Sequence, residues 1–458
     1  MVRNKRLHRF LTGEQLESRA MLAGNVTASV SGGVLVLRGD GADNDITITQ
    51  VDSDTYTVAG LDTSVNGDLL PADFSGVTKG FNIDLRGGND ILSIEALEAV
   101  SGNAIIHMSA GDDSVSLAAS LTGNVIIDTG TGNDTVLIAG IEVGNALKVN
   151  TGAGDDSVEI SDTLVGGHMH IVTGNGADLV TVSGTSANSA FINSGNGNDE
   201  VTLTSSATVG ATTLLTGGGN DLVTVEIYDA SALVVNAGAG ANDVLVTDVI
   251  TDHAVTVVAG SGSDLIEVSL IEASALVVNA GNGANEVTVG DVTVDGNVVV
   301  NAGSGNDLMT VSAIAAKSVI VNAGSGHDDV LISGLDLRHD LVTNLGAGND
   351  LLEVSEVFVD GVLVIIGGAG NDEILVTGAE VGINAVINAG TGHDLVTLES
   401  VAVVDDLFAI LGSGDDDLAI GGSSADRAFL IGGAGNDTYL DNGGNSFGSV
   451  HKSSISDV

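Results

Sequence analysis

Regularly spaced aspartates are the residues of this sequence best placed to do chemistry. They end a Gly-x-Gly-Asn-Asp-like segment that recurs along the chain, and we name the last residue of each segment the anchor. Apolar residues stand two and four positions after all anchors but the last, and this phase places Asn242 and Asn285 at two anchors instead of Asp243 and Glu286. Fifteen of the 17 anchors, which are 21, 22 or 23 residues apart, are aspartates: Asp90, Asp113, Asp134, Asp156, Asp178, Asp199, Asp221, Asp264, Asp307, Asp328, Asp350, Asp372, Asp394, Asp416 and Asp437.

The chemistry that these anchors suit is the binding of a hard cation. Carboxylate and backbone carbonyl oxygens are the ligands of Ca²⁺, which takes about 6–8 of them. Glycine beside the anchor leaves the backbone free to turn and to aim carbonyl groups inward. If the segments stack about 4.8 Å apart, neighbouring carboxylates repel by about 1 kcal/mol even in water. The column therefore needs a cation, screening or partial protonation, and two interpretations stay open: a calcium site between consecutive turns, or a structural corner with screened aspartates.

Short β-strands must position these anchors. A Val-, Ile- and Thr-rich strand with period-two alternation follows each anchor, and a second apolar run leads back to the next glycine-rich turn. A unit of about 22 residues cannot bury its own apolar face, but stacked copies can. The sequence predicts an all-β parallel β-solenoid of about 17 regular coils with two or three strands each, hence a rod of about 80 Å at a spacing of about 4.8 Å.

A column of asparagines also supports stacking. Each member lies six residues before an anchor, and four of them occupy successive coils. Side-chain amides in such a column can bond to one another along the rod. The members are Asn150, Asn193, Asn236, Asn279, Asn301, Asn322, Asn344 and Asn388.

The chain divides into four parts by composition. Residues 1–24 are a basic, targeting-like segment, and residues 25–80 are an irregular β cap in which Asn44 has the phase of an anchor. Residues 81–440 form the solenoid repeats. Residues 441–458 form a polar C-terminal tail that we expect to be mobile. The irregular cap is expected to cover the exposed edge of the first regular coil.

Composition excludes several classes of protein. Lys and Arg total 13 against 61 Asp and Glu, which gives a net charge of -48 and excludes binding to nucleic acid. The chain has no Cys, and no apolar run approaches the roughly 20 residues of a membrane span. Its 43% hydrophobic content argues against disorder, although only 2% of the residues are aromatic.

The glycine-rich segments resemble the hemolysin-type, or repeats-in-toxin, family of calcium-binding β-rolls. That family repeats Gly-Gly-x-Gly-x-Asp-x-apolar-x, and the nearest matches are Gly367–Leu375 and Gly432–Asp437. The resemblance implies that the aspartate anchors bind Ca²⁺ between stacked turns and that the ion drives folding outside the cell. The family has two such turns per coil, whereas this chain has one, and the loss of charge at Asn242 and Asn285 puts calcium at those turns in doubt.

Residues 16–22 resemble a second known motif. Their sequence, Leu-Glu-Ser-Arg-Ala-Met-Leu, is similar to the Leu-Glu-Pro-Arg-x-Leu-Leu segment near the N-terminus of planctomycete surface proteins, with Ser18 in place of the proline. The resemblance implies an extracellular or cell-surface location. The alternative is a basic tail without a targeting role.

We expect a non-enzymatic protein with a structural or adhesive role, whose partners are calcium ions and cell-surface or matrix components. The alternative is a polysaccharide-active β-helix enzyme, a lyase or hydrolase. Such enzymes need basic residues beside paired acid and base groups. The one local cluster of mixed chemistry is Arg338-His339-Asp340, which we interpret as a surface turn. His168 and His170 share a strand face but lack a third ligand for a transition metal.

Overall fold

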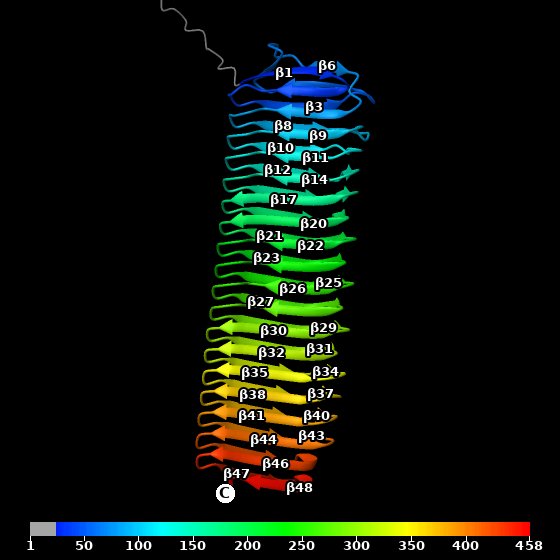
Figure 1. Cartoon of the computed structure of the whole chain (residues 1–458). Coiled ribbons are helices and arrows are strands. Elements are labelled where there is room, and N and C mark those ends of the chain that lie inside the picture. The colour runs from blue at the N-terminus through cyan, green and yellow to red at the C-terminus, as the bar shows by residue number, and fades with distance from the viewer. Residues whose placement is uncertain (1–23) are drawn as a thin grey trace, which may run out of the picture.

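The computed structural model describes residues 24–458, and these form a parallel β-solenoid without any helix (Figure 1). The coils follow one another along a straight rod, about 22 residues apart, with about 17 turns. The fold class and the spacing that the sequence predicts are therefore confirmed. The basic segment and its Leu-Glu-Ser-Arg motif lie outside the described residues.

The strands that follow the anchors form one long side of the rod, which we name the first sheet. Each pairs in parallel with its equivalent in the next coil, as Val244 with Ile266 and Val246 with Val268. The first-sheet strands are β8 (Ile91–Glu95), β10 (Ser114–Ala118), β12 (Thr135–Ala139), β15 (Ser157–Ser161), β18 (Leu179–Ser183), β21 (Glu200–Thr208), β23 (Leu222–Ala230), β25 (Asp243–Thr251), β27 (Leu265–Ala273), β29 (Glu286–Val294), β31 (Leu308–Ala316), β33 (Asp329–Ser333), β36 (Leu351–Ser355), β39 (Glu373–Thr377), β42 (Leu395–Glu399), β45 (Asp417–Gly421) and β47 (Thr438–Gly443).

The strands that lead back to the glycine-rich turns form the opposite long side, the second sheet. They too pair in parallel from coil to coil, as Val299 with Ile320. The second-sheet strands are β7 (Gly80–Asp84), β9 (Asn103–His107), β11 (Val125–Asp128), β14 (Leu147–Asn150), β17 (His168–Asn175), β20 (Ser189–Asn196), β22 (Ala211–Leu215), β24 (Ala232–Asn236), β26 (Ala254–Val258), β28 (Ala275–Asn279), β30 (Asn297–Ser304), β32 (Ser318–Ser325), β35 (Leu341–Ala347), β38 (Leu363–Ala369), β41 (Ala385–Thr391), β44 (Asp406–Ser413), β46 (Ser424–Ala434) and β48 (Ser446–Ser453).

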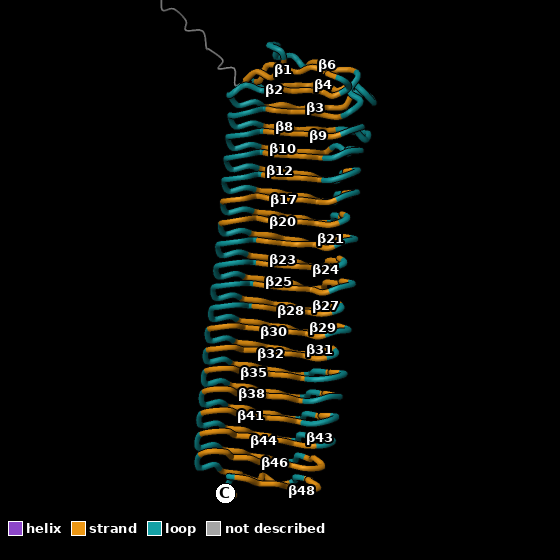
Figure 2. The backbone as a smooth tube through the Cα atoms, in the orientation of Figure 1, coloured by secondary structure: helices purple, strands orange, loops and turns teal. Residues whose placement is uncertain are grey.

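A short third side joins the two sheets at the edge opposite the glycine-rich turns (Figure 2). In the middle coils the first-sheet strand is longer and bends to form this third side. In most other coils the third side is a separate strand of two residues. The corner between them uses a left-handed residue six positions after the anchor, such as Gly140 (φ 65°) or Ile227 (φ 52°). The separate strands are β13 (Glu142–Val143), β16 (Leu164–Val165), β19 (Ser186–Ala187), β34 (Asp336–Leu337), β37 (Phe358–Val359), β40 (Glu380–Val381) and β43 (Ala402–Val403).

Alternation along each strand produces one continuous core between the sheets. In β27 the side chains of Ile266 and Val268 are fully buried, whereas Leu265 and Glu267 face outward. Equivalent residues stack in columns, so that Val244, Ile266 and Val287 contact their neighbours along the rod. Burial of the apolar columns stabilises the stack by about 25 cal/mol per Å² of apolar area.

The N-terminal end departs from the repeat, as the sequence predicts. Strands β1 (Gly24–Ser31) and β2 (Val34–Arg38) pair antiparallel, and so do β3 (Asp45–Gln50) with β4 (Thr55–Gly60) and β4 with β6 (Ala72–Ser75). Strand β5 (Thr63–Val65) pairs with β1. Strand β3 pairs in parallel with β8, so the first regular coil lies directly on this irregular cap.

At the C-terminal end the parallel pairing continues beyond the expected limit of the solenoid. The segment that we expected to be a mobile tail contains β48, which pairs with β46, and β49 (Ser456–Asp457), which pairs with β47. Its polar side chains are mostly exposed, as expected. The repeat pattern fails here because Asp441 replaces an apolar core residue, yet backbone pairing does not require that residue.

Candidate metal centre

The glycine-rich turns stack along one edge of the rod, and two residues with positive φ shape each of them. Both are glycines from the turn of Asp134 onward, whereas Arg86 (φ 78°) and Ser109 (φ 82°) take the first position in the turns of Asp90 and Asp113. The glycines two and four residues before an anchor have positive φ, for example 152° at Gly348 and 101° at Gly346. A Cβ atom on Gly348 would overlap the carbonyl oxygen of Gly326 in the preceding coil. Glycine is therefore required both by the backbone conformation and by the close approach of the next turn.

All 17 anchors, the two asparagines included, point into the turns and form one buried column. Their exposed fractions are 0–4%. One side-chain oxygen, Oδ1, of every anchor accepts a hydrogen bond from the backbone N–H of the anchor in the preceding coil. These N···O distances are 2.7–3.1 Å. We name this column the inner ladder.

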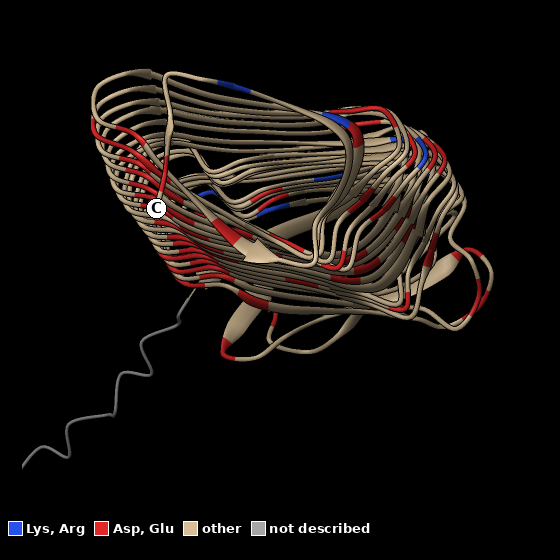
Figure 3. Cartoon of the chain, turned by 90° about the horizontal axis from the view of Figure 1, so that it is seen from below, with Lys and Arg blue, Asp and Glu red and all other residues tan. Residues whose placement is uncertain are grey.

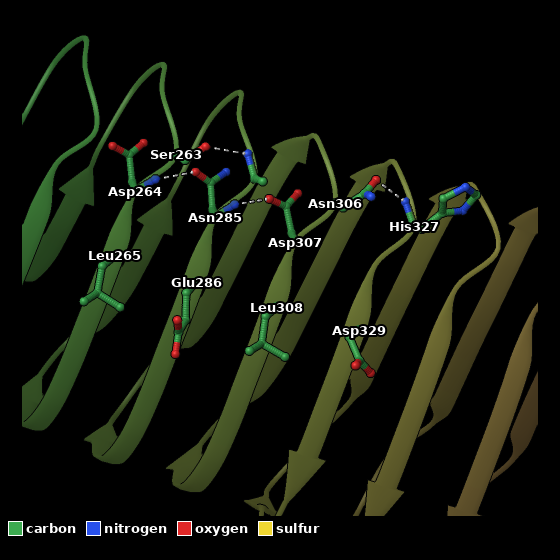
Figure 4. A pocket seen from close by; sticks show the side chains of 11 residues that line it. Ser263, Asp264, Leu265, Asn285, Glu286, Asn306, Asp307, Leu308, His327 and Asp329 are labelled. Atoms are coloured by element: carbon green, nitrogen blue, oxygen red, sulfur yellow. Dashed lines mark hydrogen bonds between the residues drawn. The ribbon is translucent and has the colours of Figure 1, made fainter.

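The inner ladder confirms the phase that the apolar pattern gives. Asn242 and Asn285 occupy it, whereas Asp243 and Glu286 lie outside the turn as the first residues of their strands. Asn44 begins the column, because its backbone N–H donates to Asp90 Oδ1 at 2.7 Å. Figure 4 shows three members, Asp264, Asn285 and Asp307, with both connecting bonds.

A second, exposed ladder runs beside the first in the opposite direction. Except at Ala177, Ala241 and Ala284, which have no side-chain acceptor, the residue before an anchor accepts the backbone N–H of its equivalent in the following coil, as Asn349 Oδ1 does from Asn371 at 2.8 Å. His327 and His393 serve in the same way, because their Nδ1 atoms accept from Asn349 at 2.7 Å and from Asp415 at 2.9 Å. These histidines are thus variants of the turn, as the sequence indicates.

The other carboxylate oxygen of every aspartate anchor, Oδ2, is buried and has no hydrogen-bond partner among the described residues. The asparagine anchors reveal what surrounds that atom. Asn242 Nδ2 donates to Ala259 O in the following coil at 3.2 Å. Asn285 Nδ2 donates to Ala302 O in the following coil at 3.3 Å and to Gly283 O in its own turn at 3.2 Å. The equivalent Oδ2 atom of an aspartate thus lies where an amide finds carbonyl acceptors, and it brings no donor.

Burial perturbs the ionisation of this column. Loss of hydration raises the pKa of the aspartate anchors from Asp90 to Asp416, and the N–H bond to Oδ1 opposes the rise. The pKa reaches about 7 at Asp113, where Asp134 and Asp90 add charge repulsion. It reaches about 6 at Asp90, Asp156, Asp328 and Asp372.

Hydroxyl groups near the anchors divide the column into two kinds of coil. Thr or Ser stands five residues before the anchors from Asp134 to Asp221, and Thr129 Oγ1 donates to Thr151 O in the following coil at 3.3 Å. These hydroxyls act to lower the pKa of the neighbouring anchors, as Thr151 does for Asp156. From Asn242 onward Ala, Leu or Gly fills this position, so the later coils offer no hydroxyl there.

The donor set consists of oxygen alone. One carboxylate oxygen and the carbonyl oxygens located by Asn285 converge between consecutive coils, which suits a hard cation such as Ca²⁺. The described residues hold no group of three or more His, Cys, Asp or Glu side chains arranged for a metal ion. Each turn contributes one carboxylate to the line, so the remaining ligands of an ion would be backbone carbonyls or water.

The other sequence candidates do not converge on the turns. His168 Nδ1 bonds to Ser189 Oγ at 2.7 Å, and His170 stacks on Phe191 with ring centroids 4.9 Å apart. Arg338 donates to backbone oxygens, including Asp295 O at 2.7 Å. Sequence reasoning found the column but missed the free Oδ2 atoms. The signal was present, because Asn at two anchors indicates a position that accepts an amide donor.

Beside the turns, the outer face of the first sheet carries an alternating row. The residue after the anchor is Leu or an acidic residue in strict alternation from Leu179 to Asp417, and Figure 4 shows Leu265, Glu286, Leu308 and Asp329 of this row. Its leucines are 38–44% exposed. Together with the turn residues, this row lines a shallow groove.

Comparison with known proteins found no matching family model, no similar curated protein and no similar solved structure. Among residues 24–458 there is also no helix of the length and apolar character that a bilayer crossing requires.

Proposed function

We propose that this chain is a structural β-solenoid that binds Ca²⁺ along its glycine-rich turns. The observation that carries the proposal is the column of fifteen buried Oδ2 atoms without a donor. An unpaired buried carboxylate is costly, so the folded chain gains stability from any cation that reaches it. The role is mechanical, because the ions would hold consecutive coils together.

The residues that would hold the ions are the fifteen aspartate anchors and the carbonyl groups around them. In the coil of Asp264, for example, the carboxylate would be joined by the Gly262 carbonyl of its own turn and by the Ala280 carbonyl of the next coil. These are the positions that Gly283 and Ala302 occupy around Asn285. Asn242 and Asn285 would bind no ion, since their amide groups already donate to the carbonyls. We infer that these two turns interrupt the series of ions.

The proposed location is extracellular or at a cell surface, where millimolar calcium can occupy weak sites. The net charge of -48 and the Leu-Glu-Ser-Arg motif support this location and a non-enzymatic, adhesive or matrix role. Partners would be calcium and components of the surface or matrix.

Calorimetry and thermal unfolding of the full chain test the proposal. We expect heat of Ca²⁺ binding and a higher melting temperature with Ca²⁺ than with chelator. A matched pair of variants locates the effect: Asp328→Asn removes a charge from the inner ladder, and Asp329→Asn removes one from the outer surface next to it. Only the first should reduce calcium uptake. No uptake by the wild type, or an equal loss in both variants, overturns the proposal.

A further inference from the structure

The outer face of the second sheet lacks the acidic charge that covers the rest of the rod. We consider the outward side chains ten, eight and six residues before each anchor from Asp264 to Asp437, and name them the neutral face. Only Asp340, Asp406 and Arg427 are charged there, and Arg427 pairs with Asp406 at 2.6 Å. In Figure 3 acidic residues crowd the turn edge, whereas the long side formed by the second sheet is almost free of them.

An apolar row runs along the middle of this face. It consists of Val277, Val299, Ile320, Val342, Val364 and Val386, which lie directly above one another in consecutive coils. All six are half-buried by their neighbours, so their outer surfaces form a flat strip. The first sheet offers no equivalent strip, because the row beside its turns places an acidic residue in every second coil.

Three successive asparagines of the neutral face bond to one another. Asn301 Nδ2 donates to Asn279 Oδ1 at 2.5 Å, and Asn322 Nδ2 donates to Asn301 Oδ1 at 2.7 Å. Part of the predicted asparagine column is thereby confirmed. Amides that are paired within the face lose little when water is removed from it, so this face can be covered at low cost.

We propose that the neutral face is a self-association surface, on which a second copy of this chain packs second sheet against second sheet. Nine strands about 4.8 Å apart and about five residues wide give a face of about 700 Å² per copy. A pair would then bury about 1,400 Å², in the lower half of the range for specific complexes. The inference is independent of calcium binding.

Charge favours a second copy with this orientation over any other. Two molecules of charge -48 repel wherever their acidic faces meet, and the neutral face is where that repulsion is least. Facing β-branched rows pack as in β-sandwiches, with the sheets about 10 Å apart, and a two-fold arrangement closes the pair. A neutral polysaccharide fits less well, because Phe408 and Phe429 stack on each other at 4.7 Å instead of presenting their rings outward.

Sedimentation of the full chain tests this proposal. We expect a monomer–dimer equilibrium at tens of micromolar protein, shifted toward dimer in 0.5 M NaCl because salt screens the net charge. Val342→Lys, in the middle of the neutral face, should weaken dimerisation at least tenfold. The matched control is Thr310→Lys, a half-buried outward residue of the first sheet, which should leave it unchanged.

Chemical cross-linking provides a second measurement of dimerisation if Val342→Lys does not fold. The chain has no cysteine, so Val342→Cys gives a single reactive site. A bismaleimide of about 10 Å should join two copies through Cys at this position but not through Thr310→Cys. The proposal is overturned by a wild type that stays monomeric in 0.5 M NaCl, by equal effects of the two lysine variants, or by equal cross-linking. Binding of neutral polysaccharide by a monomer would identify the other occupant.

Discussion

Without divalent cations the rod should become less stable as the pH rises from 5 to 8, the reverse of ordinary acid denaturation. The pKa of the Asp328 carboxyl lies near 6 in the folded chain because burial removes its hydration, whereas the ordinary pKa of an aspartate is 3.8. A group with a raised folded-state pKa stabilises fully below its unfolded pKa, and that contribution is lost as the pH rises through the folded value.

The magnitude follows from the shift. A difference of about 2.2 pKa units corresponds to about 3 kcal/mol for Asp328, at about 1.36 kcal/mol per unit. The pKa of about 7 at Asp113 corresponds to about 4 kcal/mol. The neighbouring anchors influence one another, so these contributions do not add. When the Asp328 carboxyl is protonated, its O–H can donate to a backbone carbonyl equivalent to those that accept from the Asn285 amide, so protonation removes both the buried charge and the unpaired oxygen.

Urea unfolding followed by circular dichroism, at constant ionic strength and with chelator present, measures this dependence. The midpoint should fall between pH 5 and pH 8, and Ca²⁺ at pH 8 should restore it. Asp328→Asn should flatten the dependence between pH 5 and pH 8 by about 1.4 kcal/mol, because only the last pH unit below the folded pKa of about 6 falls in this range, while Asp329→Asn should not, although both remove one charge. A midpoint that stays constant or rises with pH in chelator would refute the argument that the inner ladder is stabilised by protons or cations.

Four further substitutions test other parts of the structure by thermal unfolding. Gly348→Ala should destabilise by at least about 3 kcal/mol, because its Cβ overlaps Gly326 O, whereas Gly140→Ala, with open space around its Cβ, should cost only about 1–2 kcal/mol for the left-handed backbone. Asn285→Asp should destabilise the chelated protein by about 1–3 kcal/mol, since two carbonyls lose their donor, and should add a calcium-dependent gain that the wild-type turn lacks. Ile227→Gly should stabilise by about 1 kcal/mol, because this residue is 53% exposed and holds a left-handed φ of 52°; a loss of stability would show that its side chain matters more than its backbone.

Much of this fold follows from local sequence. The spacing of the anchors and the apolar residues two and four positions later are enough to place Asn242 inside the turn and Asp243 outside it. The reason is that successive side chains of a strand point to opposite faces, so the burial of Val244 requires the side chain of Asp243 to face outward. The same rule identifies the core columns and the approximate length of the rod.

Other features depend on how coils meet, which no single repeat reveals. The direction of the inner ladder, with each Oδ1 bonded to the backbone N–H of the preceding coil, is a property of two turns in contact and not of one repeat. The antiparallel cap formed by β4 and β6 arises where the repeat pattern is absent. Strand β48 at the C-terminal end pairs with β46 through the backbone, and its Phe447 packs against the edge of the core, so the loss of an apolar residue at Asp441 gave a misleading signal.

The acidic residues of this chain form two groups, the buried anchors and the surface carboxylates, and the two groups should respond differently to salt. Under the proposed function the buried anchors should respond to an ion that enters the turn, whereas the surface carboxylates should respond to screening within about 10 Å at 0.1 M salt. Sodium chloride should therefore promote association through the neutral face but should not replace calcium in the inner ladder. Mg²⁺ gives a sharper comparison: it screens as a divalent ion but demands six near-octahedral ligands at short distance, which a line of single carboxylates does not provide. Calcium should stabilise the fold more than magnesium, while both should favour the dimer equally.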